Sequence, residues 1–156
     1  MADDKMLRAQ RVFETMCQSL DARNWHYNRI EGELAIESGA QGDDLPMEIR
    51  VRVDADRQLI TLLSHIPYVV PEDKRLDVAI AVGSVNSGIV DGSFDYNITN
   101  GHIFFRLTSS FIESEVGGEL FTYMLNCSFS TIDEYNDKFL MLGKGMLSVK
   151  DFISNN

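Results

Sequence analysis

The side chains best suited to bind a metal ion are spread thinly along the chain. The three histidines stand far apart, and none has a second possible ligand three or four residues away: His26, His65 and His102. A zinc site needs several such ligands brought together. Two aspartate pairs, Asp54 with Asp56 and Asp91 with Asp95, lie in turn-like segments without the ligand pattern of an EF-hand. The sequence therefore predicts no metal site and no cofactor.

Groups that could act as a nucleophile, an acid or a base are also isolated from one another. Acidic clusters at residues 113–119 and 133–137 fall in the first turns of predicted helices, where carboxylates interact favourably with the helix dipole. Cys17 and Cys127 have no metal-ligand spacing and are expected to be reduced, buried thiols. We predict no catalytic residue and a protein that is not an enzyme.

The charge of the chain limits the partners that it can attract. Twenty-four acidic and fourteen basic residues give a net charge of −10. Nucleic-acid binding relies on Lys and Arg contacts to phosphates, and an anionic membrane repels an acidic surface. No apolar run approaches the roughly 20 residues that span a bilayer, and the first residues lack the features of a signal peptide. We expect a soluble cytoplasmic protein that binds neither nucleic acid nor membrane.

Apolar spacing in the first half of the chain predicts one helix followed by strands. Residues 4–22 are predicted to form an amphipathic helix, because one stripe recurs at helical spacing: Ala9, Phe13, Met16 and Leu20. Strands are predicted at residues 25–30, 33–37, 47–53 and 59–64, the third from its alternation of apolar and charged residues. Residues 38–44 are expected to form a loop rich in Gly and Asp, and Pro67 and Pro71 are expected to bracket another.

The second half predicts a helix, a β-hairpin and further helices. The helix runs from about residue 72 to residues 86–90, and strands at 93–98 and 102–108 are joined at Asn100-Gly101. Ser114 is expected to open a third helix, and residues 131–134 form a capping box that restarts it. A last short helix is predicted at residues 148–153. Because strands meet through short turns, the fold class is α+β, an antiparallel sheet packed against helices.

The chain resembles the YbjN family, described as bacterial sensory transduction regulators, between about Phe13 and Gly145. The residues that carry the resemblance are Trp25, Pro67 with Val70-Pro71, Arg75, Asn86, Gly92-Ser93-Phe94, Gly101 with Phe105-Arg106, and Asp133 with Tyr135. The resemblance implies the order α-β-β-β-α-β-β-α, a fold similar to type III secretion chaperones, no known catalysis and often a dimer. Secretion chaperones are themselves small and acidic and bind extended segments of other proteins. The resemblance assigns no site residue.

The second predicted helix carries more apolar surface than packing on one sheet requires. At 100° per residue it has two apolar stripes, one with Leu76, Ala79, Ile80, Gly83 and Val90 and the other with Val78, Val82, Val85 and Ile89. One stripe can cover the sheet, so something else must bury the second. We predict that the second stripe is a partner interface, contacting the equivalent helix of a second subunit in a homodimer: Val78, Val82, Val85 and Ile89. The alternative is that the first or third helix of the same subunit covers it.

The sequence thus predicts one domain over residues 1–156, with a core at about 5–145 and a short C-terminal extension at 146–156. It favours a non-enzymatic bacterial regulatory or chaperone-like protein that acts through protein–protein contacts. One alternative is a sensor that binds a small ligand between the sheet and the helices. The other is a hydrolase whose Asp and His side chains are scattered in the sequence.

Overall fold

The computed structural model describes residues 2–155. The first half holds α1 (Ala2–Ala22), β1 (Tyr27–Arg29), β2 (Ala35–Gln41), β3 (Pro46–Asp54) and β4 (Leu59–Val69). The second half holds a 3₁₀ turn (Glu72–Lys74), α2 (Arg75–Gly88), β5 (Ser93–Asn97), β6 (His102–Ser110), α3 (Gly118–Gly143) and α4 (Val149–Ser154). The α+β class is confirmed. Four strands stand before α2, one more than the order that the family resemblance implied.

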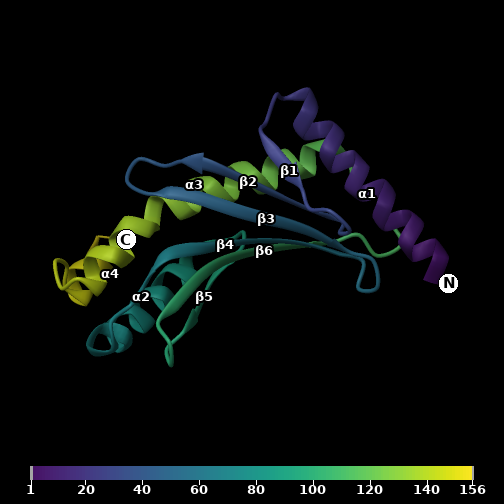
Figure 1. Ribbon diagram of the computed structural model, residues 1–156. Helices are drawn as coiled ribbons and strands as arrows, with labels where there is room; N and C mark the ends of the chain where they lie inside the picture. Colours follow the sequence, from purple (N-terminus) through teal and green to yellow (C-terminus); the bar gives the residue numbers. More distant parts are fainter. Residues whose placement is uncertain (1, 156) are drawn as a thin grey trace.

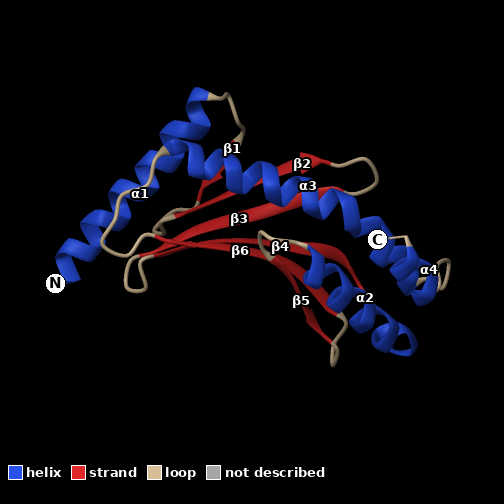
Figure 2. Ribbon diagram, turned by 180° about the vertical axis from the view of Figure 1, so that it is seen from behind, coloured by secondary structure: helices blue, strands red, loops and turns tan. Residues whose placement is uncertain are grey.

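The six strands form one antiparallel sheet in the order β1-β2-β3-β4-β6-β5 (Figure 1). In β3 buried and exposed residues alternate strictly, because one face of the sheet is covered and the other is open. Seen from behind in Figure 2, α1, α2 and α3 lie on the same side of the sheet. Within residues 2–155 no helix lies over the opposite face.

Aromatic side chains fill the core beneath β5 and β6. The ring of Phe94 lies 5.3 Å from Phe105 and 5.1 Å from Phe139, and Phe139 stacks on Phe152 of α4 at 5.6 Å. Burying one such side chain contributes roughly 1.5–3 kcal/mol. The C-terminal extension is thus part of the packing, since α4 inserts Phe152 between α2 and α3.

Two predicted loops are partly strand. Residues 38–41 belong to β2 because they pair with residues 46–49 of β3, and this cross-strand pairing outweighs the weak strand preference of Ser and Gly. Pro67 lies inside β4, where the pairing with β6 shifts register between His65 and Val69. Proline lacks an N–H to donate, and an irregular strand position accommodates that.

The predicted break in the third helix does not occur. Residues 114–117 precede α3, which is one continuous helix of 26 residues, so the capping box at 131–134 lies in its middle. Its buried residues recur at helical spacing along its whole length and hold it against the core: Phe121, Leu125, Ser128, Ile132, Asn136, Phe139 and Leu142.

The predicted β5–β6 hairpin is confirmed, with a longer turn than a two-residue loop. The strands are joined by residues 98–101, and only Gly101 of these has a positive φ, 78°. A side chain there would also clash with the Val70 carbonyl oxygen. Glycine is therefore required at this position on both grounds.

Candidate functional site

An open groove lies at the β1–β4 end of the sheet, beside the end of α1. β3 and β4 pair only from Arg50–Leu63 to Asp54–Leu59 and then diverge, as Figure 1 shows. Across the point of divergence, the Ser64 hydroxyl donates a hydrogen bond to the Glu48 carbonyl. The groove has a volume of about 1140 Å³, and its lining comes from the end of α1, the segment between α1 and β1, and strands β1 to β4: Asp21, Trp25, His26, Tyr27, Asn28, Arg29, Glu37, Ser38, Gly39, Glu48, Ile49, Arg50, Leu63 and His65.

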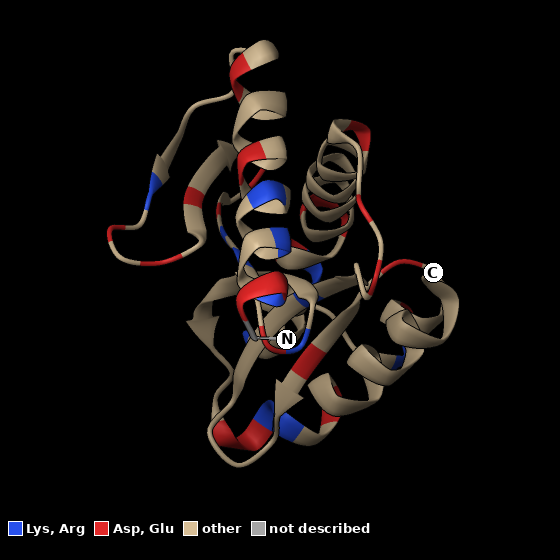
Figure 3. Cartoon of the chain, turned by 90° about the vertical axis from the view of Figure 1, so that its right-hand side faces the viewer, with Lys and Arg blue, Asp and Glu red and all other residues tan. Residues whose placement is uncertain are grey.

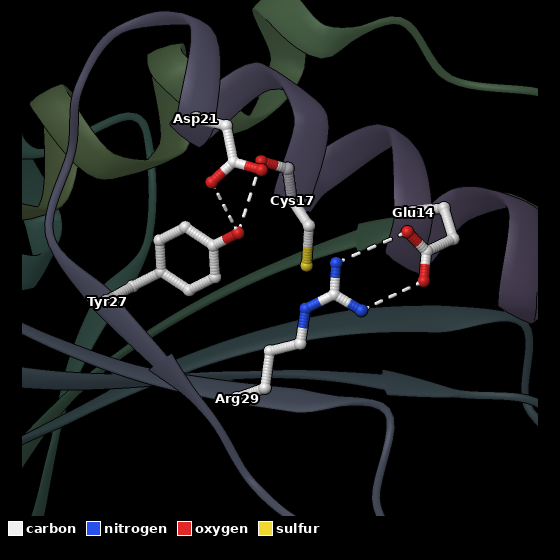
Figure 4. Close-up of polar contacts among 5 residues, drawn as sticks. All are labelled: Glu14, Cys17, Asp21, Tyr27 and Arg29. Atoms are coloured by element: carbon white, nitrogen blue, oxygen red, sulfur yellow. Dashed lines mark hydrogen bonds and ion pairs between the residues drawn. The ribbon is translucent and has the colours of Figure 1, made fainter.

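One rim of the groove is the contact between α1 and β1 (Figure 4). The Tyr27 hydroxyl donates to Asp21 Oδ1 at 2.8 Å and lies 3.4 Å from the Cys17 carbonyl oxygen. Both terminal nitrogens of Arg29 donate to the Glu14 carboxylate, at 3.0 and 3.3 Å. These contacts hold a strand of only three residues in place, since β1 pairs with β2 alone.

Three groups of this rim, Tyr27, Arg29 and Cys17, have pKa values raised by their surroundings. Burial and the hydrogen bond to Asp21 raise the pKa of Tyr27 to about 12. The hydrogen bond to Glu14 raises the pKa of Arg29, and burial raises the pKa of the Cys17 thiol. At neutral pH Tyr27 and Cys17 are therefore neutral, which makes both poor nucleophiles and poor bases. The rim braces β1 and is not arranged for proton transfer.

Trp25 fixes the start of β1. Its indole N–H donates to the Ser38 hydroxyl at 2.7 Å, and that hydroxyl donates to the His26 carbonyl oxygen at 2.7 Å. The indole ring stacks on Phe129 of α3 with 5.7 Å between centroids. The aromatic surface at the mouth of the groove is thus held rigidly by α3.

A comparison with models of protein families identifies the family of the chain. Residues 13–141 match the model of the family described as "YbjN: Putative bacterial sensory transduction regulator". The chain belongs to the YbjN family. This confirms the resemblance found in the sequence. No curated protein matches the chain.

Two solved structures share the YbjN fold seen here. YbjN of E. coli, described as "a putative transcription regulator", has a TM-score of 0.57 at 14% identity, covering 78% of this chain and 86% of that one. The complex of ExsC, a type III secretion chaperone, with ExsE matches with a TM-score of 0.54 at 11% identity. That match covers 81% of this chain and 94% of the other. At these identities the likeness establishes the fold.

The outer edges at the two ends of the YbjN sheet are covered differently. At the β5 end, the Asn86 side chain of α2 accepts a hydrogen bond from the Phe94 N–H at 2.8 Å and donates one to the Phe94 carbonyl at 2.9 Å. An amide side chain thereby takes the place of a neighbouring strand. At the other end β1 pairs with β2 only at residues 36–38, so residues 39–41 have no strand beside them on that side in the described part of the chain. The sequence marked Asn86 as a family residue without revealing this role.

The structure places the predicted interface stripe inside the subunit. Val78, Val82 and Val85 are buried, and Ile89 is half-buried against the same core, because α2 packs on α3, α4 and β5. Val78, Val82 and Val85 are therefore not available to a second subunit, and the intrachain alternative describes them, while Ile89 is partly exposed. The exposed apolar side of α2 is the other stripe, with Leu76 at 72% and Ile80 at 52% exposure.

The structure shows where the histidines and cysteines lie. His26 and His65 line the groove, and His102 is exposed on β6. Within residues 2–155 no group of three or more His, Cys, Asp or Glu could hold a metal ion. Cys17 is buried as predicted, whereas Cys127 is only half-buried, and both are free thiols.

The acidic residues of α3 do not all lie where the sequence placed them. Only Glu119 lies in the first turn, whereas Asp133 and Asp137 lie in the middle of the helix. Asp133 Oδ1 accepts a hydrogen bond from the Asp43 N–H at 2.9 Å. The charge of Asp137 raises the pKa of Asp44, so the β2–β3 turn and α3 together form an acidic cluster: Asp43, Asp44, Asp133 and Asp137.

Proposed function

We propose that this YbjN-family chain is a non-enzymatic regulatory or chaperone-like protein that acts by binding another protein. The observation that carries the proposal is the groove at the β1–β4 end of the sheet, beside an incompletely paired strand edge. Such a site suits a segment in extended conformation, which can pair its backbone with a strand edge and place alternate side chains in a groove.

The lining of the groove supports a peptide as its occupant. Trp25, Tyr27 and Leu63 offer apolar and aromatic surface, while Arg50 and Glu37 offer charges that already pair with each other at 3.7 Å. Aromatic side chains and Arg are enriched in the parts of protein surfaces that bind other proteins. The structure of ExsC with ExsE shows that a protein of similar fold occurs in complex with a second protein.

The rival functions have less support from the geometry. A metabolite sensor was expected to bind its ligand between sheet and helices, but the cavity there, lined by residues such as Met16, Ile36 and Phe121, has a volume of about 10 Å³. That space holds one water at most. A hydrolase would need an activated nucleophile, and the raised pKa values of Cys17 and Tyr27 act against one.

We also propose that the protein forms a homodimer through the exposed stripe of α2. Leu76 and Ile80 are one helical turn apart, and Val90, just beyond the helix, is 95% exposed. In a two-fold contact, the exposed stripe of one subunit would pack against the same stripe of the other subunit, and both would be removed from water. The interface thus stays on the predicted helix, but it uses the stripe with Leu76 and Ile80 in place of the stripe that was predicted.

Charge supports a protein partner in place of nucleic acid. In Figure 3 the basic residues of α1 are interspersed with acidic ones, and the whole chain carries a net charge of −10. Within residues 2–155 no helix is long and apolar enough to cross a membrane. We place the protein in the cytoplasm, where free thiols such as those of Cys17 and Cys127 are stable.

The proposal is tested by peptide binding. Peptides selected from a displayed random library on the unmodified protein are synthesised, and their affinity is measured by fluorescence anisotropy. Leu63→Asp, in the groove, is expected to weaken binding at least 10-fold, whereas Thr108→Asp, exposed on β6 outside the groove, leaves it unchanged. Circular dichroism confirms that both variants fold. Failure to select any peptide that binds below 100 µM, or equal binding by Leu63→Asp, would contradict the proposal.

A further inference from the structure

The edge of β2 is only half covered. β1 pairs with residues 36–38, and beyond them Gly39, Ala40 and Gln41 pair with β3 on one side only. Figure 1 shows β2 continuing past the end of β1 toward the β2–β3 turn. Gly39 and Gln41 are exposed. An uncovered strand edge offers unpaired N–H and C=O groups to an incoming strand.

The direction of the backbone groups on this edge follows from the neighbouring hydrogen bonds. The Ile30 N–H donates to the Ala35 carbonyl on the β1 side, and the Gly42 N–H donates to the Leu45 carbonyl on the β3 side. In an antiparallel ladder successive residues direct their backbone groups to opposite sides. Residues 39 and 41 therefore direct their N–H and C=O groups toward the uncovered side.

Features of opposite character mark the two ends of this uncovered stretch. At its start, Trp25 is bonded to Ser38 and stacked on Phe129 of α3. At its far end, the Asp43 N–H is bonded to Asp133, four residues further along α3. Three strand residues, Gly39 to Gln41, and the turn residue Gly42 separate Ser38 from Asp43. One end is aromatic and the other is the acidic cluster, so an occupant meets an apolar surface and then negative charge.

The acidic end favours a cation. The side chains of Asp44, Asp133 and Asp137 come from a turn and a helix that are distant in sequence, and repulsion from Asp137 raises the pKa of Asp44. A positive side chain placed among them would relieve this repulsion. The same charges oppose an acidic segment or a phosphate backbone.

We propose that the uncovered edge of β2 is a docking site for an extended, basic segment of a partner protein. The segment adds as a strand beside Gly39 and Gln41, with a Lys or Arg side chain at Asp44, Asp133 and Asp137 and an apolar side chain toward Trp25. This rests on the proposed function and names the chemistry of the partner. At the β5 end Asn86 already occupies the outward-facing backbone groups of Phe94, which leaves less of that edge for an added strand.

The first test removes the backbone donor and the charge separately. Gln41→Pro eliminates a backbone N–H that faces the uncovered side. Gln41→Ala is its control, because it also removes the Gln side chain but keeps the N–H. The double variant Asp133→Asn with Asp137→Asn retains an oxygen that can accept from Asp43, and Glu119→Gln with Glu134→Gln is its charge-matched control on α3. For the library-selected peptides, Gln41→Pro and the Asp double variant are expected to weaken binding at least 10-fold. Both controls bind as the unmodified protein does.

The second test uses the peptide itself. N-methylation of each backbone nitrogen in turn is expected to abolish binding at alternate positions, because only every second N–H of an added strand points to β2. Loss without this period of two, or unchanged affinity for both Gln41→Pro and the Asp double variant, would overturn the inference. If Leu63→Asp still weakened binding in that case, the proposed function would stand without this edge. A lower sedimenting mass for Gln41→Pro with unchanged peptide binding would assign the edge to self-association and also overturn the inference.

Discussion

The two ends of the sheet differ in how the backbone groups of their edges are bonded. At the β5 end, the Asn86 side chain bonds both backbone groups of Phe94, and the Phe94 ring lies in the aromatic core. At the β1 end, a strand of three residues is held by polar contacts at its rim and leaves half of β2 uncovered. Unpaired strand edges promote association, and proteins normally cover them. We therefore expect association to occur at the uncovered edge of β2 more readily than at β5, where Asn86 bonds Phe94.

Removing the Asn86 side chain, which bonds the outer edge of β5, should have the largest effect on stability. Asn86→Ala leaves the N–H and C=O of the buried Phe94 without partners, and we expect a loss of about 2 kcal/mol in the free energy of unfolding. The newly open edge should also cause association that increases with protein concentration. Urea unfolding and light scattering measure the two effects. Asn28→Ala, on exposed β1, is the control and should change stability by less than about 0.5 kcal/mol. An Asn86→Ala protein as stable as this control would show that β5 is not closed by Asn86.

At the β1 end, loss of a single hydrogen bond should have a smaller effect on stability. Tyr27→Phe removes the hydrogen bond to Asp21 and is expected to cost about 1 kcal/mol at neutral pH. The pKa of Tyr27 is raised from 10.0 to about 12 by folding, so its contribution is complete below pH 10 and is lost as the pH rises toward 12. Urea unfolding at pH 8 and pH 11 checks this. The stability difference between the two proteins should narrow at pH 11, and a difference that widens would contradict the role of the neutral hydroxyl.

The smallest stability effect is expected on the outer side of α2, although the mass should change. Leu76 and Ile80 are exposed within the subunit, so Leu76→Asp with Ile80→Asp should alter the unfolding free energy of the subunit by less than about 1 kcal/mol. Sedimentation should show a dimer for the unmodified protein and a 17.6 kDa monomer for this variant. Val82→Asp is the contrasting variant, since its buried charge should unfold the subunit. A monomeric unmodified protein at tens of micromolar would remove the dimer.

Local patterns predicted the elements whose buried side can be recognised from the spacing of their own apolar residues. The alternation at residues 47–53 predicted β3, and the stripe through Ala9 and Leu20 predicted α1, because each has one buried side. The end of β2 and the passage of β4 through Pro67 were not predicted. They depend on pairing with β3 and β6, which are distant in sequence or follow later in the chain.

The candidate site was harder to predict for the same reason. The groove joins β1 with β4 through the divergence of β3 and β4, and no local spacing indicates where two strands separate. The helical periodicity of α2 showed correctly that two stripes exist. It could not show which one meets α3 and α4, because both are apolar and the choice is made by packing.

The central claim is that the sheet is open along β2 and closed at β5, and amide hydrogen exchange tests it most directly. In the free protein we expect the Phe94 amide to be protected by Asn86 and the Gln41 amide to exchange rapidly. Saturation with a selected peptide should slow exchange at Gln41 and leave Phe94 unchanged. A Gln41 amide that is already protected in the free protein, or that exchanges as fast with peptide bound, would contradict the account.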